Sequence, residues 1–262
     1  MYKKLKESLK FIYSATRSGR NFRILPNDAF IVSYPKSGNT WLRFLVANLL
    51  NEGQEITFAN IDRIIPDIYN KVRFSSKPLT LKSHEFYDPR YRRVIYIVRD
   101  PRDVVLSYYH YFLKINVIYD TYPLSEFVDQ FLNSELDNFG NWKSNVGSWF
   151  GARMGDEDFL LLRYEDMLIM PTEKLSEIAI FLGINVSRDQ IDNVVARSSF
   201  ERMQSIENKT GHKWGSLKNN RLDRKFVRLG TAEQWRLGLS VEDSKKIHDR
   251  WGELMSKFGY QS

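Results

Sequence analysis

The stretch from Ala29 to Leu50 constrains the fold most, because it joins a short strand, a polar loop and a helix without interruption. The apolar run 29–32 has the length of a buried strand, and apolar residues recur at helical spacing from Trp41 onwards. The loop 35–40 between them carries one lysine and two hydroxyl groups. A strand that turns directly into a helix points unpaired backbone N–H groups and the positive end of the helix dipole at one place. The sequence therefore predicts an anion-binding site, for which phosphate is the usual occupant.

This loop differs from the loop that binds nucleoside triphosphates, G-x-x-x-x-G-K-[ST], in which a lysine follows the second glycine. Here Lys36 precedes Gly38, and no first glycine stands at the required position. A purely structural interpretation is that small polar residues only make the turn. Lysine, serine, glycine and threonine together exceed what a turn requires, so we favour anion binding.

Composition limits the class of protein. The 262 residues match a single α/β domain and suffice to bury a core, and the net charge of +7 favours an anionic ligand, a nucleic acid or an acidic membrane surface. The chain has no cysteine, which excludes disulfides, thiolate metal sites and a cysteine nucleophile, and which is compatible with a cytoplasmic location. No apolar run has the length that is needed to span a bilayer.

Residues 1–20 have the pattern of a basic amphipathic helix, in which Leu5, Leu9 and Ile12 share one face among several lysines. Charged residues interrupt the apolar ones, so we do not expect a secretory signal. Such a helix either packs on its own domain or lies on anionic lipid, and the sequence leaves peripheral membrane contact open. We interpret residues 1–27 as a leading helix and a connector to the first strand.

Three further apolar runs predict strands at 79–82, 94–98 and 159–163. The helical patterns that follow or separate them lie at 101–113, 171–182, 187–197, 199–206 and 241–258. Residues 207–230 are polar, basic and weakly periodic, and we expect a mobile loop that closes over the ligand. Strands that alternate with helices, without repeats or a domain boundary, predict one P-loop-like α/β domain with a central, mostly parallel sheet flanked by helices.

A polar or charged residue follows each predicted strand; these residues are Lys36, His84, Arg99 and Tyr164. Each has a structural explanation when it is taken singly, but ligands of open parallel sheets bind at the carboxyl edge, where the four strand ends meet. Aromatic residues between positions 114 and 158 either pack helices together or form the wall of an apolar pocket, and both interpretations stay open.

These segments resemble the sulfotransferases that use 3′-phosphoadenosine 5′-phosphosulfate (PAPS), above all the cytosolic type, and the resemblance runs from about Asp28 to Arg236. Residues 34–41, YPKSGNTW, look like the family's 5′-phosphosulfate loop, and residues 96–110 look like its 3′-phosphate segment. Lys82-Ser83-His84 resembles the family's Lys-Thr-His, whose histidine is the catalytic base. Tyr164-Glu165-Asp166-Met167 and Ser198-Ser199-Phe200 resemble two further shared segments that reach the nucleotide.

The resemblance implies roles for individual residues. His84 and Lys36 would be catalytic, and we add Lys82 because it lies two residues before His84 on the same face of an extended segment. Trp41 and Phe200 would enclose the adenine. No metal is implied. The residues implied to bind the nucleotide are Lys36, Ser37, Gly38, Asn39, Thr40, Trp41, Arg99, Ser107, Tyr164, Ser198, Phe200, Arg228 and Gly230.

Two positions depart from the family's pattern. Leu229 replaces a lysine in the late segment around Arg228 and Gly230, which leaves one 3′-phosphate contact open. Lys245 reverses the charge at the end of the short dimerisation motif, which leaves the oligomeric state open.

In sulfuryl transfer, negative charge develops on the departing phosphate oxygen, where cations and N–H donors stabilise it. A neutral histidine can accept the proton of the attacking hydroxyl near pH 7. We therefore expect transfer from PAPS to a phenol, a hydrophobic alcohol or a glycolipid by in-line displacement, with His84 as the general base.

Two alternatives remain. One is a P-loop kinase for small molecules, although such a kinase would need a lysine after the loop glycine. The other is a non-catalytic protein that binds a polyanion. The basic residues are spread along the chain rather than clustered, so we do not expect a nucleic-acid partner.

Overall fold

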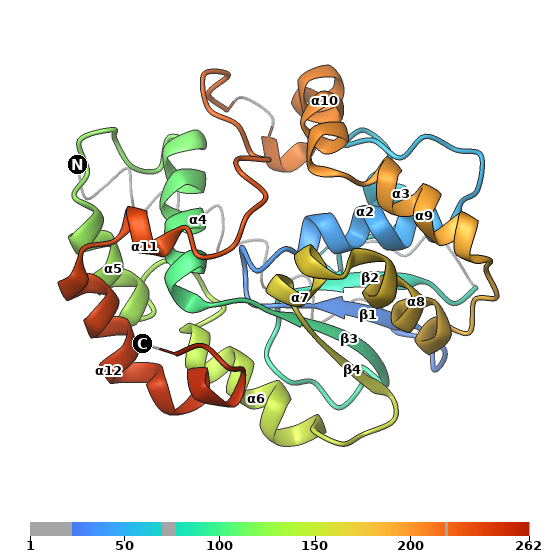
Figure 1. Cartoon of the computed structure of the whole chain (residues 1–262), viewed down its shortest axis with the longest axis horizontal. Helices are drawn as coiled ribbons and strands as arrows, with labels where there is room; N and C mark the ends of the chain where they lie inside the picture. The colour runs from blue at the N-terminus through green and yellow to red at the C-terminus, as the bar shows by residue number, and fades with distance from the viewer. Residues whose placement is uncertain (1–22, 70–76, 218–219, 262) are drawn as a thin grey trace.

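The computed structural model describes residues 23–69, 77–217 and 220–261, so the predicted helix at 1–20 lies outside the described residues. Within the described ranges, four strands form one sheet in the order β2-β1-β3-β4, and all of its strand pairs are parallel. Helices lie on both sides of this sheet (Figure 1). The predicted α/β fold with a central parallel sheet is confirmed.

The strands lie close to their predicted positions. Phe30 of β1 pairs with Leu81 of β2 on one side and with Val94 of β3 on the other. The second strand begins and ends one residue later than the apolar run suggested, because Ser83 continues the ladder opposite Val32. The bounds are β1 Ala29–Val32, β2 Thr80–Ser83, β3 Arg93–Val98 and β4 Phe159–Arg163.

Five of the described helices, α3, α5, α6, α7 and α11, lie outside the helix ranges predicted from the sequence. Helices α3, α7 and α11 have four to six residues, too few to show a helical period. The helix predicted at 199–206 continues to Thr210, and two 3₁₀ turns follow at Gly211–Lys213 and Gly215–Leu217, so the first part of the expected loop 207–230 is helical. The α-helices are α2 Asn39–Leu50, α3 Ile61–Ile64, α4 Pro101–Lys114, α5 Leu124–Leu132, α6 Trp142–Arg153, α7 Tyr164–Ile169, α8 Pro171–Leu182, α9 Arg188–Arg197, α10 Phe200–Thr210, α11 Trp235–Gly238 and α12 Val241–Lys257.

The sheet is buried on both faces, and alternate residues of each strand point to opposite sides. Phe30 and Val32 of β1 belong to a core shared with α4, α5, α6 and α12, whereas Ile31 belongs to a core shared with α2, α8 and α9. In Figure 1 the same two groups of helices lie on opposite sides of the strands. Burial on both faces explains why the strands are near-continuous apolar runs rather than alternating ones.

The starts of the helices differ in how their backbone N–H groups are satisfied. The carboxylate of Asp100 accepts from the Arg102 N–H at the start of α4, where Pro101 occupies the first position. Helix α2 has no side-chain cap and no acidic residue in its first turn, because Gly38 occupies its N-cap. The start of α2 therefore leaves donors and a positive dipole end for another group.

A buried ion pair anchors the segment that follows the 3₁₀ turns. Lys114 Nζ, at the end of α4, lies 3.5 Å from Glu207 Oε1, and both side chains are buried. The two Glu207 oxygens also accept from the backbone N–H groups of Phe226, at 2.7 Å, and Val227, at 2.8 Å. Lys114 Nζ donates to the Arg224 carbonyl oxygen at 2.7 Å. We call this arrangement the Glu207 clasp.

Replacing Glu207 by alanine leaves the Lys114 ammonium buried without its carboxylate and two backbone donors without an acceptor. We expect the Glu207→Ala variant to lose about 3 kcal/mol or more of unfolding free energy, measured by urea denaturation. Glu201→Ala, an exposed glutamate on the same helix, is the control and should cost no more than about 1 kcal/mol. Equal midpoints for the wild type and Glu207→Ala would show that the clasp does not stabilise the fold.

Candidate active site

A cavity of about 370 Å³ opens at the carboxyl edge of the sheet. Because the strands are parallel, the residues that follow them converge there. Thirteen of the predicted site residues line the cavity: Lys36, Gly38, Asn39, Thr40, Trp41, Lys82, His84, Arg99, Ser107, Tyr164, Phe200, Arg228 and Gly230. The structure thus brings together residues from the ends of all four strands of the described sheet.

Two predicted residues, Ser37 and Ser198, are fully buried and do not belong to the lining. Ser37 Oγ has no hydrogen-bond partner among the described residues. Ser198 Oγ accepts from Asn48 Nδ2 at 3.0 Å, and the Ser198 carbonyl accepts from Trp41 Nε1 at 3.0 Å. In this structure Ser198 therefore holds the Trp41 ring in place instead of facing the cavity.

The loop before α2 has the backbone conformation of an anion site. Both Lys36 (φ 66°) and Gly38 (φ 101°) adopt left-handed conformations, so the chain turns sharply into the helix. A Cβ atom on Gly38 would lie 2.6 Å from the ring of Tyr164. Glycine is therefore required here both by its dihedral angles and by the close approach of Tyr164.

The ammonium group of Lys36 lies over two aromatic faces, 4.1 Å from the centroid of Tyr111 and 4.3 Å from that of Phe226. It forms no ion pair with a carboxylate within the described part of the chain. Burial, followed by repulsion from Arg99 and Arg228, lowers the pKa of Lys36 to about 7. An anion in the cavity would reverse the effect of that repulsion.

Two guanidinium groups lie near Lys36. Arg99 Nη2 is 3.2 Å from Asp103 Oδ2 and donates to the Thr231 carbonyl at 3.2 Å, whereas Arg99 Nε is buried with no partner among the described residues. Burial and the charge of Arg99 lower the pKa of Arg228 from its usual value. The unmatched donor and the mutual repulsion of these cations fit a ligand that carries more than one negative charge.

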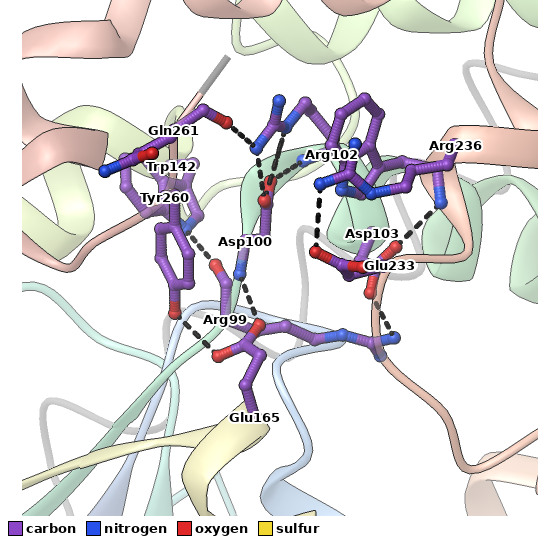
Figure 2. Close-up of polar contacts among 11 residues, drawn as sticks. Arg99, Asp100, Arg102, Asp103, Trp142, Glu165, Glu233, Arg236, Tyr260 and Gln261 are labelled. Carbon is purple, nitrogen blue, oxygen red and sulfur yellow. Dashed lines mark hydrogen bonds and ion pairs between the residues drawn. The ribbon is translucent and has the colours of Figure 1, made fainter.

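A hydrogen-bond network fixes the turn between β3 and α4 that carries Arg99 (Figure 2). Trp142 Nε1 donates to the Arg99 carbonyl at 3.1 Å, and the Asp100 N–H donates to Glu165 Oε1 at 3.1 Å. The second Glu165 oxygen accepts from the Tyr260 hydroxyl at 2.9 Å. Sequence reasoning missed this network because its members come from distant parts of the chain.

His84 is held in one tautomer. Its Nδ1 lies 2.8 Å from the carbonyl oxygen of Ser33, which can only accept, so Nδ1 carries the proton and Nε2 keeps a lone pair. Burial, followed by the charge of Lys82, lowers the pKa of His84 well below its usual value of 6.5. At neutral pH the imidazole is therefore neutral and can accept a proton at Nε2.

Lys82 is partly neutralised. Its Nζ lies 2.5 Å from Asp67 Oδ2, and both side chains are partly buried. The positive charge that the sequence assigned to this position is therefore weaker at the cavity than the lysine alone would supply. The ion pair could not be predicted from the sequence, because Asp67 lies in an irregular segment that an isolated bridge to Lys82 joins to the sheet.

The sequence profile of the Sulfotransferase domain matches residues 26–259. The chain belongs to the sulfotransferase family. It is 29% identical to Sulfotransferase 2B1 of Homo sapiens over 247 residues, a match that covers 87% of this chain and 66% of that protein. It is 26% identical to Sulfotransferase 1E1 of Bos taurus, over 97% of this chain and 90% of that protein. The crystal structure of mouse sulfotransferase SULT7A1 complexed with PAP superimposes with a TM-score of 0.75 at 26% identity, over 92% of this chain and 89% of that chain.

Membership of this family identifies the chain as a sulfotransferase, in preference to a kinase or a non-catalytic binder of polyanions. Among the described residues, no group of His, Asp or Glu side chains is arranged to hold a metal ion. In the same ranges, no helix has the length and apolar character that crossing a bilayer would require.

The aromatic residues predicted between positions 114 and 158 mostly pack the fold. Phe127, Phe131, Trp142 and Trp149 are fully buried in the core, which supports the packing interpretation for them. Phe139 lines the cavity of the sulfotransferase, where its ring lies 5.5 Å from that of His84. The other aromatic lining residues come from outside this range: Trp41, Tyr108, Tyr111, Phe112, Tyr164, Phe200, Trp214 and Phe226.

The low pKa of Lys36 can be measured directly. We expect the ¹⁵N resonance of Lys36 Nζ to titrate with a midpoint near pH 7, and the midpoint to rise when inorganic sulfate is added, because the anion stabilises the ammonium form. Anion binding should accordingly weaken as the pH rises through this midpoint. The Lys36→Arg variant lacks the signal and assigns it. A midpoint that stays near 10.5 would contradict the environment described for Lys36.

Proposed function

We propose that this sulfotransferase transfers a sulfuryl group from PAPS to a hydroxyl group of its acceptor, with His84 as the general base. The observation that carries the proposal is the arrangement of Lys36, Arg99 and Arg228 in the cavity that also exposes a neutral His84. A donor with phosphates at both its 5′ and 3′ positions supplies the negative charge that offsets the repulsion among these three cations. PAP in the complex of mouse SULT7A1 supports a nucleotide of this type.

In this proposal the cations divide between the two ends of the nucleotide. Lys36 and the open N–H groups at the start of α2 bind the 5′-phosphosulfate, with Gly38, Asn39 and Thr40 forming the loop around it. Arg99, Ser107 and Arg228 bind the 3′-phosphate, which distinguishes PAPS from ATP. Exposed Leu229 stands where the family pattern has a lysine, so Arg99 and Arg228 supply the charge at that end.

Trp41 and Phe200 are proposed to bind the adenine. The Trp41 ring is fixed by its bond to the Ser198 carbonyl and meets Tyr164 edge-on, with 5.8 Å between centroids. Gly230 packs against the Phe200 ring, where a Cβ atom would lie 2.5 Å from Phe200 Cδ2, and its φ of 63° also favours glycine. Neighbouring residues therefore restrain the rings of both Trp41 and Phe200, as stacking on a nucleotide base requires.

In the reaction, PAPS supplies the sulfuryl group, and the side chains manage protons and charge. His84 Nε2 accepts the proton of the acceptor hydroxyl, while the Ser33 carbonyl holds the proton on Nδ1 and stabilises the imidazolium that forms. Lys36 and the loop N–H groups stabilise the charge that develops on the departing phosphate oxygen. Lys82 adds a smaller positive contribution because of its ion pair with Asp67.

The general-base role predicts that His84→Ala lowers kcat about 10²–10⁴-fold, the usual effect of losing such a group, with little change in the Kd for PAP. Only the neutral imidazole accepts a proton. The midpoint of the acid limb in the wild-type profile of kcat against pH should therefore lie below the ordinary histidine pKa of 6.5. The kcat of the variant and the pH profile of the wild type are measured by transfer from radiolabelled PAPS. Near-normal turnover by His84→Ala would remove His84 from the mechanism.

The adenine platform is tested by binding alone. Trp41→Ala and Phe200→Ala should each weaken PAP binding by about 1–3 kcal/mol, roughly 5–150-fold in Kd, as measured by calorimetric titration. Tyr119→Ala, at an aromatic residue that is 59% exposed and outside the cavity lining, is the matched control and should leave the Kd unchanged. Unaltered affinity in both cavity variants would reject the proposed stacking.

The acceptor is proposed to be a phenol, a hydrophobic alcohol or a glycolipid, because aromatic side chains line the cavity that holds His84 and the Phe139 ring lies next to the imidazole. Incubation with radiolabelled PAPS and a panel of these compounds tests both the activity and the acceptor class, and failure to label any of them would count against the proposal. The oligomeric state, the membrane contact of residues 1–20, the cytoplasmic location and the closure of 207–230 over the nucleotide stay predictions.

A further inference from the structure

The lining of the cavity contains one carboxylate among the described residues, Asp137. It lies in the segment between α5 and α6, and its side chain is buried. The charged residues elsewhere in the lining are basic: Lys36, Arg43, Lys82, Arg99 and Arg228. A nucleotide that carries several negative charges gains nothing from an acid in its site, so this carboxylate calls for a different explanation.

Hydrogen bonds place Asp137 near the reacting group. Asp137 Oδ1 accepts from the backbone N–H of Phe139 at 2.7 Å, and the Phe139 ring lies 5.5 Å from that of His84. The other carboxylate oxygen, Oδ2, accepts from the hydroxyl of Tyr108, which also lines the cavity. Asp137 thus sits two residues from the ring that contacts the proposed base.

The carboxylate has neutral donors but no cationic partner. No lysine or arginine of the described ranges forms an ion pair with Asp137, and the groups that stabilise its charge are the Tyr108 hydroxyl and the Phe139 N–H. Burial raises the pKa of Asp137 to about 6, so the group is still mostly ionised at pH 7. A buried carboxylate without a counter-ion is costly, and a cationic ligand would remove that cost.

The surroundings suit a particular kind of cation. The rings of Tyr108, Phe112 and Phe139 line the same cavity as Asp137, and aromatic faces attract ammonium groups. We propose that Asp137 binds a protonated amine of the acceptor, so that the preferred acceptors are phenols or alcohols that carry a cationic nitrogen. This inference rests on the proposed function, because it identifies the acceptor class of the same site.

The test compares two phenols of nearly the same shape. Tyramine carries an ammonium group where 4-propylphenol carries a methyl group. Calorimetric titration of each phenol into the full chain saturated with PAP measures binding without any chemical step. We expect wild-type protein to bind tyramine about tenfold or more tightly than 4-propylphenol, since a hydrogen bond to a charged group contributes about 1.5–3 kcal/mol.

Asp137→Asn removes the charge and keeps the shape. It should lower the affinity for tyramine about tenfold or more and change that for 4-propylphenol less than about threefold. Glu135→Gln, an exposed acid on the same segment and outside the lining, is the matched control and should alter neither. Thermal unfolding checks that both variants are folded, and the wild-type comparison decides the question alone if Asp137→Asn is not.

Two results would overturn the inference. Wild-type protein that binds 4-propylphenol as tightly as tyramine shows that the cavity does not select an amine. An equal loss for both phenols in Asp137→Asn shows that Asp137 only supports the cavity wall. The proposed function is judged separately, by transfer from radiolabelled PAPS to either phenol in the wild type: no transfer with a retained tyramine preference rejects the activity and leaves the assignment of Asp137 intact.

Discussion

Repulsion among Lys36, Arg99 and Arg228 is the constraint on which the rest of the site depends. Each of these cations lies at least partly buried beside the others, and burial together with this repulsion lowers the pKa of Lys36 to about 7. Such groups separate or become neutral unless a scaffold holds them. The parallel sheet supplies that scaffold at the ends of β1 and β3, and Asp103 restrains Arg99 from behind. A bound polyanion turns this unfavourable arrangement into a favourable one, so the repulsion among the cations favours binding.

The parts of the site that could be predicted from the sequence are those that follow from strand ends. Buried strands show up as short apolar runs, and parallel strands must end at one edge, so Lys36, His84, Arg99 and Tyr164 could be assigned to one place from residue order alone. The β4 bounds and the start of α4 were predicted correctly for the same reason, because burial and a proline-led cap leave strong local patterns. The family was predicted correctly from the motifs that these strand ends carry.

The remainder could not be predicted because it depends on partners that are distant in the chain. Nothing local marks Glu207 as the residue that binds the backbone of Phe226 and Val227, so the sequence pattern predicts a loop throughout 207–230. Ser198 belongs to a recognisable motif, yet its hydroxyl faces Asn48 rather than the cavity. Asp137 lies in an irregular segment without periodicity, and only its contacts with Phe139 and Tyr108 in the folded chain bring it to the cavity lining.

The two aromatic faces that contact Lys36 have a further effect. Tyr111 and Phe226 give the ammonium a resting position, so any incoming anion must compete with them for the same charge. A small, singly charged ion gains too little from one lysine to displace it, whereas a ligand that engages several cations at once does so readily. The two rings therefore favour multiply charged ligands over singly charged ions at this site.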